Sequence, residues 1–328
     1  DKTRGKYTLG LSSIGRDGET VDRVTQTEKP KIYIYAGTII ATCANCYRLS
    51  DATLEILHVT NINTPLGKII LTRAVSDGYV EIAGPSTTSD MKYVIDMMKK
   101  WGAQKIFIDG ALSRKSLASP TVAQATILST GASLSSNVAR VIKETVLSYN
   151  LLNIEKLENI KIAKLIKRTQ DKLYENENTC IDKTKYKAAA KNRSCVVIIN
   201  NEEQVSYADC GTILGREIAV IENVDVHSRY IYTSGAITDT FIDSLLKNIS
   251  KKNHISLIVD DGTKLFINED NLAKLTYRKI ALFALDKINI CAITVNPFSA
   301  QDYSIDSIFL INELKKHIEI PIFDVKGV

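Results

Sequence analysis

The chain has 328 residues, of which 45% are apolar and 24% charged, and this near-average composition indicates a globular protein with enough core for two domains. Its 42 basic and 37 acidic residues leave a net charge of +5, too small an excess to predict a nucleic-acid-binding protein. No apolar run approaches the roughly 20 residues of a membrane-spanning helix, and no signal segment opens the chain. The six cysteines are irregularly spaced, which does not resemble a disulfide framework. We therefore expect a cytoplasmic protein.

Strand and helix patterns alternate through the first half of the chain. The predicted strands are apolar runs bounded by turn residues. They are residues 8–14, 31–42 as a strand pair or one long strand, 66–84 as two segments around the turn at Asp77-Gly78, 105–109 and 125–131. The predicted helices are residues 86–101, which hydroxyl residues open and Gly102 closes, and residues 134–148. This alternation predicts a mostly parallel sheet flanked by helices.

The character of the chain changes in residues 155–194, which are lysine-rich and weakly patterned. We interpret them as a basic helical linker. Nucleic-acid binding is the less favoured alternative, because glutamates and asparagines interrupt the lysines. Alternation then resumes, with predicted strands at residues 195–200, 230–235, 256–261, 290–296 and 321–325 and predicted helices from residue 239, at 271–279 and at 305–317. We therefore predict two α/β domains, residues 1–154 and 195–328, with parallel and largely buried strands.

Charged and hydroxyl side chains gather in loops that follow two predicted strands. Ligands of parallel sheets bind beyond the carboxyl ends of the strands, where these loops meet. The candidate Mg²⁺ ligands, acting directly or through water, are Asp17, Glu19 and Asp109. The candidate phosphate-binding residues are Arg16, Ser113, Arg114, Lys115 and Ser116. We expect Asp17 and Asp109 to share one crevice. The alternative stays open that Asp17-Gly18 is only a turn and that the basic residues are solvated.

Several catalytic motifs do not occur in the 328 residues. The phosphate-binding patterns GxxxxGK[ST] and GxGxxG after a strand are both missing. The four histidines show no HExxH spacing, which disfavours a zinc hydrolase, and no GxSxG is present, which disfavours a serine hydrolase. Cys43 and Cys46 form a single CxxC in a strand-like context, which favours two small buried residues over a zinc or redox site.

The segments LGLSSIGRDGETVDRVTQTEKPKIYIYAGTIIAT, GYVEIAGP, IFIDGALSRKSLASP and ATILSTGASLS resemble the KamB-type subunit of the lysine 5,6-aminomutase reactivase, and so does the tail ITVNPFSAQDYSIDSIFLINELKKHIEIPIFDV. The resemblance implies a P-loop NTPase-like first domain of dethiobiotin-synthetase-like fold. It implies Asp109 in the Walker B position and as the catalytic candidate, Asp17 as a switch-like residue, and ATP with Mg²⁺ as cofactors.

The same resemblance implies a task and partners. The protein would act with a MutS-like reactivase partner subunit on lysine 5,6-aminomutase, which uses adenosylcobalamin and pyridoxal phosphate, and would promote exchange of damaged cobalamin without binding nucleic acid or membrane. The family places an NAGKTT-like P-loop before the strand at LGLSSIG, and because the chain opens on Asp1 close to that strand, we expect a missing upstream segment. Three functions stay open: an ATPase subunit, a non-catalytic scaffold with a nucleotide-binding fold, and, more weakly, a small-molecule ligase.

Overall fold

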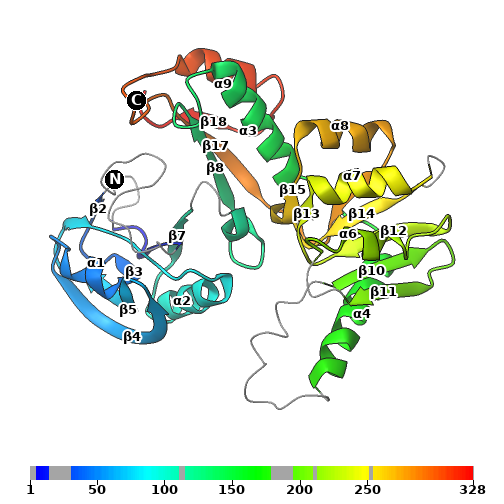
Figure 1. Ribbon diagram of the computed structural model, residues 1–328. Coiled ribbons are helices and arrows are strands. Elements are labelled where there is room, and N and C mark those ends of the chain that lie inside the picture. The colour runs from blue at the N-terminus through cyan, green and yellow to red at the C-terminus, as the bar shows by residue number, and fades with distance from the viewer. Residues whose placement is uncertain are drawn as a thin grey trace. The chain divides into compact units, whose positions relative to one another are not determined.

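The computed structural model describes residues 5–14, 31–110, 115–178, 195–209, 213–250 and 254–327. The chain forms two compact units. Unit 1 comprises Asp1–Ala123 with Ser299–Tyr303, and unit 2 comprises Gln124–Phe298 with Ser304–Val328. Both units combine helices with sheets that contain parallel strands, which confirms the predicted α/β class (Figure 1).

Unit 1 is built on a five-stranded sheet, sheet A, in the order β4-β5-β3-β1-β7. Its strands are β1 (Leu9–Ser13), β3 (Ile39–Cys43), β4 (Leu54–Thr64), β5 (Gly67–Ala74) and β7 (Lys105–Asp109). The remaining elements are β2 (Ile32–Ile34), α1 (Ala44–Arg48), β6 (Gly78–Val80), α2 (Thr88–Lys100) and the 3₁₀-helix η1 (Lys115–Ala118). Strands β3, β1 and β7 run parallel, whereas β5 is antiparallel to both β3 and β4.

Helix α2 covers one face of sheet A. Thr87 begins the helix by accepting a hydrogen bond from the Asp90 N–H at 3.1 Å, and Gly102, at φ +99°, follows its end. Its buried face presents Val94 and Met98 to the apolar side chains of β3 and β5. The predicted helix 86–101 is therefore confirmed, and α2 fixes the strands whose ends carry the candidate site.

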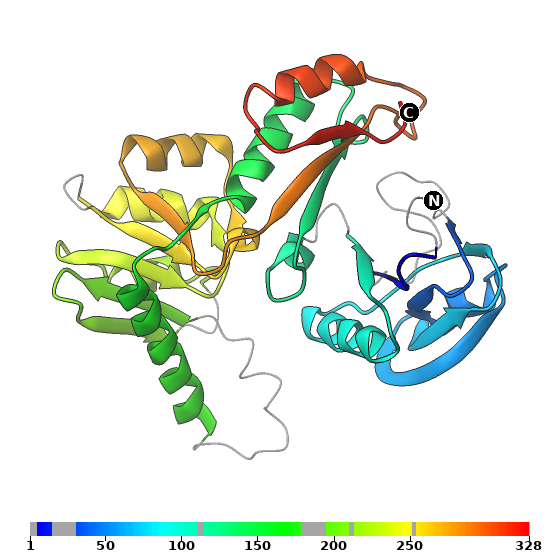
Figure 2. The same cartoon turned by 180° about the vertical axis from the view of Figure 1, so that it is seen from behind.

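Unit 2 contains a six-stranded sheet, sheet E, in the order β11-β10-β12-β14-β16-β9. Its strands are β9 (Glu155–Lys156), β10 (Cys195–Asn200), β11 (Val205–Asp209), β12 (Ser228–Thr233), β14 (Ser256–Val259) and β16 (Ala281–Ala284). The strands from β12 to β9 are parallel, and β10 is antiparallel to both of its neighbours. Helices α7 (Asp239–Asn248) and α8 (Glu269–Tyr277) lie on one face and α4 (Ile160–Asn178) on the other (Figures 1 and 2).

A second, three-stranded parallel sheet of unit 2, sheet D, has the order β18-β17-β8. It consists of β8 (Thr126–Gly131), β17 (Ile290–Asn296) and β18 (Ile322–Asp324), with α3 (Val138–Leu152) and α9 (Ser307–Leu314) packed against it. The smaller elements of unit 2 are α6 (Glu217–Ile221), β13 (Ile237–Thr238), the 3₁₀-helix η2 (Gly262–Lys264) and β15 (Leu265–Phe266).

The division of the chain differs from the predicted boundaries. Residues 124–154 group with unit 2 because β8 pairs with β17 over its whole length. The first part of the predicted linker is also folded into unit 2, since β9 pairs with β16 and α4 packs on sheet E. Residues 179–194 lie outside the described part of the chain.

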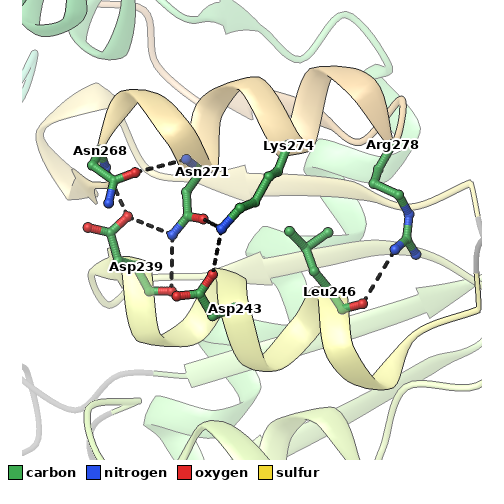
Figure 3. A network of polar contacts seen from close by, with 7 residues as sticks. All are labelled: Asp239, Asp243, Leu246, Asn268, Asn271, Lys274 and Arg278. Atoms are coloured by element: carbon green, nitrogen blue, oxygen red, sulfur yellow. Dashed lines mark hydrogen bonds and ion pairs between the residues drawn. The ribbon is translucent and has the colours of Figure 1, made fainter.

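A polar network joins α7 to α8 (Figure 3). Asn271, only 1% exposed, donates from Nδ2 to Asp239 Oδ1 at 2.8 Å and accepts from Lys274 Nζ at 2.8 Å. Arg278 donates to the main-chain carbonyls of Leu246 and Ile249 at the end of α7. These groups satisfy one another, so the network holds the two helices together. None of the helices in the described residues combines the length and apolar character needed to cross a bilayer.

Candidate functional site

The two strands that precede the predicted site residues, β1 and β7, end at the carboxyl edge of sheet A. In the parallel pairing of β1 with β7, Ser13 lies opposite Asp109, and the Ile14 N–H donates to the Asp109 carbonyl at 3.0 Å. The loops that follow these strands therefore begin side by side. Those loops carry the predicted site residues, which places their starting points at one edge of one sheet.

Five of the predicted residues fall in loops that the structure does not describe. Arg16, Asp17 and Glu19 lie within residues 15–30, and Ser113 and Arg114 lie within residues 111–114. The shared crevice of Asp17 and Asp109 consequently remains a prediction. The structure does place Asp109, Lys115 and Ser116.

Asp109 is the last residue of β7, and its side chain is exposed. The residue after it, Gly110, has open space where a Cβ would stand. A carboxylate in this position is accessible to solvent at the edge of a parallel sheet. That is where a hydrated Mg²⁺, which commonly keeps several waters, could be held.

Lys115 opens η1 and is half-buried, whereas Ser116 beside it is exposed. Burial lowers the pKa of the Lys115 ammonium, because removing water penalises the charged form. Within the described residues no carboxylate pairs with Lys115. A partly desolvated cation of this kind favours an anionic ligand, such as a phosphate group.

The hydroxyls at the end of β1 have a structural role that the sequence did not reveal. Ser12 Oγ donates to the Ala41 carbonyl at 3.0 Å, and Ser13 Oγ donates to the Ile82 carbonyl at 3.0 Å. Gly84 approaches so closely that a Cβ there would lie 2.0 Å from the Ser13 carbonyl oxygen. The end of β1 is thus fixed by β3 and by the segment after β6, and both hydroxyls already have partners.

The CxxC pair is part of the core of unit 1. Cys43 is 0% exposed and Cys46 is 4% exposed, and neither thiol forms a disulfide. Cys43 Sγ accepts from the Cys46 N–H at 3.5 Å and so begins the short helix α1. No group of three or more potential metal-binding side chains occurs among the described residues. The burial of Cys43 and Cys46 fits the interpretation that they are two small core residues.

Unit 2 contains a polar site that the sequence analysis missed. Asp260 and Asp261 follow β14 directly, at the carboxyl edge of sheet E. Tyr232, which is 0% exposed, donates to Asp260 Oδ1 at 2.6 Å, and Asp261 accepts from the Thr263 N–H at 2.9 Å. The signal was present in the sequence, because two carboxylates follow an apolar run just as Asp109 does.

Comparisons with known protein families, with curated proteins and with solved structures give no match for this chain.

Proposed function

We propose that this protein is a cytoplasmic subunit of an ATP-dependent reactivating factor for lysine 5,6-aminomutase, an enzyme that uses adenosylcobalamin and pyridoxal phosphate. In this proposal it acts with a MutS-like partner subunit and promotes the exchange of damaged cobalamin for intact coenzyme. The sequence resemblance motivates the family. The observation that carries a nucleotide-dependent role is the pairing of Ser13 with Asp109, because it starts both charged loops at one sheet edge.

The residues at this edge suit the magnesium-bound phosphates of ATP. Asp109 would hold or orient Mg²⁺ through water, and Lys115 with Ser116 would contact phosphate oxygens. Arg16, Asp17, Glu19, Ser113 and Arg114 would complete the site from the two loops. ATP would supply the free energy of hydrolysis that resets the protein after each exchange.

The outer edge of β7 supports the same proposal. Among the described residues β7 pairs on one side only, with β1, although its centre is the apolar sequence IFI. The free edge of an apolar strand is normally protected by another strand, a helix or a loop. The strand that leads into the P-loop, which the resemblance implies, would find its pairing partner there.

Reactivation requires that the closed mutase be opened so that its cofactor can leave. A protein that binds the open form more tightly than the closed form shifts that equilibrium only by the difference between its two affinities. The protein therefore needs a surface that distinguishes the two forms and a step that releases it afterwards. Nucleotide turnover would supply the release.

A second candidate is a non-catalytic scaffold subunit with a nucleotide-binding fold. The observation in its favour is that the pattern GxxxxGK[ST] does not occur in the 328 residues. In that case the protein would bind the mutase and its partner subunit, and reactivation would not depend on ATP bound to this chain.

The two candidates are separated by a reactivation assay. Cobalamin-inactivated mutase is incubated with fresh adenosylcobalamin, the full-length protein and its partner subunit, with and without ATP and Mg²⁺, and recovered turnover is measured. We expect ATP-dependent recovery, and we expect Asp109→Asn to reduce it roughly 10- to 100-fold, as the loss of a group that orients a metal does. Asp96→Asn is the matched control, since Asp96 is an exposed residue of α2 that pairs with Lys99 on the same helix.

Each outcome of this assay decides one point. Recovery without ATP supports the scaffold. Full recovery by Asp109→Asn removes Asp109 from the mechanism. An absence of recovery with wild-type protein, partner and ATP contradicts the assignment to the reactivase.

A further inference from the structure

Helix α4 carries a polar residue where its core-facing stripe should continue. Ile162 and Ile166 are buried against sheet E, with side chains that include Val197 and Tyr232 around them. The next position four residues on is Gln170, which lies on the same helix face. Its amide Nε2 donates to Tyr232 Oη at 2.5 Å, so the amide keeps a partner although it is partly buried.

The contact continues beyond Tyr232 to the carboxyl edge of the sheet. Tyr232 Oη donates to Asp260 Oδ1 at 2.6 Å. Since Asp260 is two residues after Ile258, it projects to the same face of β14 as that residue, which belongs to the core that α4 covers. Gln170, Tyr232 and Asp260 therefore form a relay from the helix through β12 to the end of β14.

The protonation of Asp260 sets the direction of the relay. An ionised carboxylate can only accept, so Tyr232 must donate to it and accept from Gln170. A protonated Asp260 can donate to Tyr232 instead, and the hydroxyl can then donate to Gln170 Oε1 once that amide turns. The relay can thus form in both states, with its hydrogen bonds reversed.

Charges of both signs surround Asp260. Burial, the largest influence, raises the pKa of the Asp260 carboxyl. The hydrogen bond from Tyr232 and the nearby ammonium of Lys264 lower this pKa, and the neighbouring carboxylates raise it further. The titratable groups that face Asp260 are Tyr232 of β12, Lys264 of η2, and Asp261 and Asp286 from the loops after β14 and β16. From α4 the facing group is Gln170, which carries no charge.

We propose that proton uptake at Asp260 tightens the docking of the C-terminal half of α4 on sheet E, so that this helix acts as a proton-sensitive latch. The reason is linkage: α4 helps to exclude water from this face, and its release would hydrate Asp260. The docked state, in which the pKa is raised, therefore binds the proton more tightly than the released state. Docking is strongest at acidic pH and weakens as the pH rises through the raised pKa of Asp260.

Hydrogen exchange measured by mass spectrometry on the full-length protein tests the latch. Protection of the amides of residues 163–172 is followed from about pH 3.5, below the ordinary Asp pKa of about 3.9, to about pH 8 and corrected for the intrinsic exchange rate. We expect protection to fall as the pH rises, by about tenfold for each unit by which docking raises the pKa. Peptides from α8, on the opposite face of sheet E, should not follow this titration.

Variants identify the group responsible. Asp260→Asn, whose amide is neutral and can both donate and accept, should hold the acidic level of protection at every pH. Asp243→Asn, a substitution of an exposed carboxylate of α7 that is paired with Lys274, should leave the wild-type titration in place. Tyr232→Phe breaks the relay and should lower α4 protection throughout. A flat profile in the wild type, or an Asp260→Asn profile that follows the wild type, would overturn the latch.

Discussion

Gly84→Ala tests whether the end of β1 is held as tightly as the structure indicates. A Cβ at residue 84 would lie 2.0 Å from the Ser13 carbonyl oxygen and 2.5 Å from Ser12 Oγ. A Cβ and an oxygen that are not bonded to each other normally lie more than 3 Å apart. The segment after β6 must therefore move away from β1 by about 1 Å. A displacement of that size is large enough to disturb a positioned site. That movement strains the hydrogen bond from Ser13 Oγ to the Ile82 carbonyl, which is 3.0 Å long.

The expected cost has two parts. Forcing an extra methyl into a packed site costs about 1–3 kcal/mol, and losing a buried hydroxyl hydrogen bond costs about 1 kcal/mol. We therefore expect Gly84→Ala to lower the free energy of unfolding of unit 1 by about 2–4 kcal/mol. Because Ser13 lies opposite Asp109, binding of Mg-ATP should weaken as well.

The assay compares this variant with Gly110→Ala, where a Cβ would meet open space at the other strand end. Urea unfolding is followed by hydrogen exchange in β1 and β7, which reports on unit 1 alone, and Mg-ATP binding is measured by calorimetry. The control should change unfolding free energy by less than about 1 kcal/mol. Equal stability of the two variants would refute the argument that close packing at Gly84 fixes the site.

Two further predictions concern polar side chains that are removed from solvent, Asn271 wholly and Lys115 in part. Asn271→Ala removes the amide that links α8 to Asp239 and should lower the free energy of unfolding of unit 2 by about 2–3 kcal/mol. Lys316→Met, at an exposed side chain paired with Glu313, should cost less than about 1 kcal/mol. Chemical unfolding monitored in α7 distinguishes the two variants. Lys115→Met should stabilise unit 1 at neutral pH, because the buried charge on Lys115 opposes folding below its lowered pKa, and the stability difference should shrink as the pH rises through that pKa. The same variant should weaken Mg-ATP binding, because the charge favours a phosphate. Tighter Mg-ATP binding by the variant would contradict the role of Lys115.

Elements with strong local signals were predictable from the sequence. The run KIFID becomes β7 with the predicted bounds, and α2 agrees within two residues because Thr87 and Gly102 mark its ends. Of the two alternatives for residues 31–42, the strand pair is confirmed as β2 and β3, since Gly37 at φ +87° turns the chain between them. Strand β4 was not predicted, because it lies at the sheet edge and its residues are exposed or half-buried except for Thr60, so it shows no apolar run.

Contacts between distant segments were beyond the reach of pattern analysis. The pairing of β8 with β17 places residues 124–154 in unit 2, and no local feature of either strand identifies the other as its pairing partner. In the candidate site the sequence could identify Asp109 and Lys115 as residues at a strand end. The link from Tyr232 to Asp260 depends on two strands lying side by side in register, which apolar runs alone do not determine.

The placement of β8 and β17 also orders the events of folding. Ser129 of β8 and Thr294 of β17, joined through their hydroxyls at 3.0 Å, are 165 residues apart, and all the strands of sheet E lie between them in the chain. During synthesis β8 emerges from the ribosome long before its partner exists, with half-exposed Ile127 at its centre. Sheet E can assemble in that interval from the intervening residues. Sheet D then closes last, so the first strand of unit 2 to be made is among the last to be protected from aggregation.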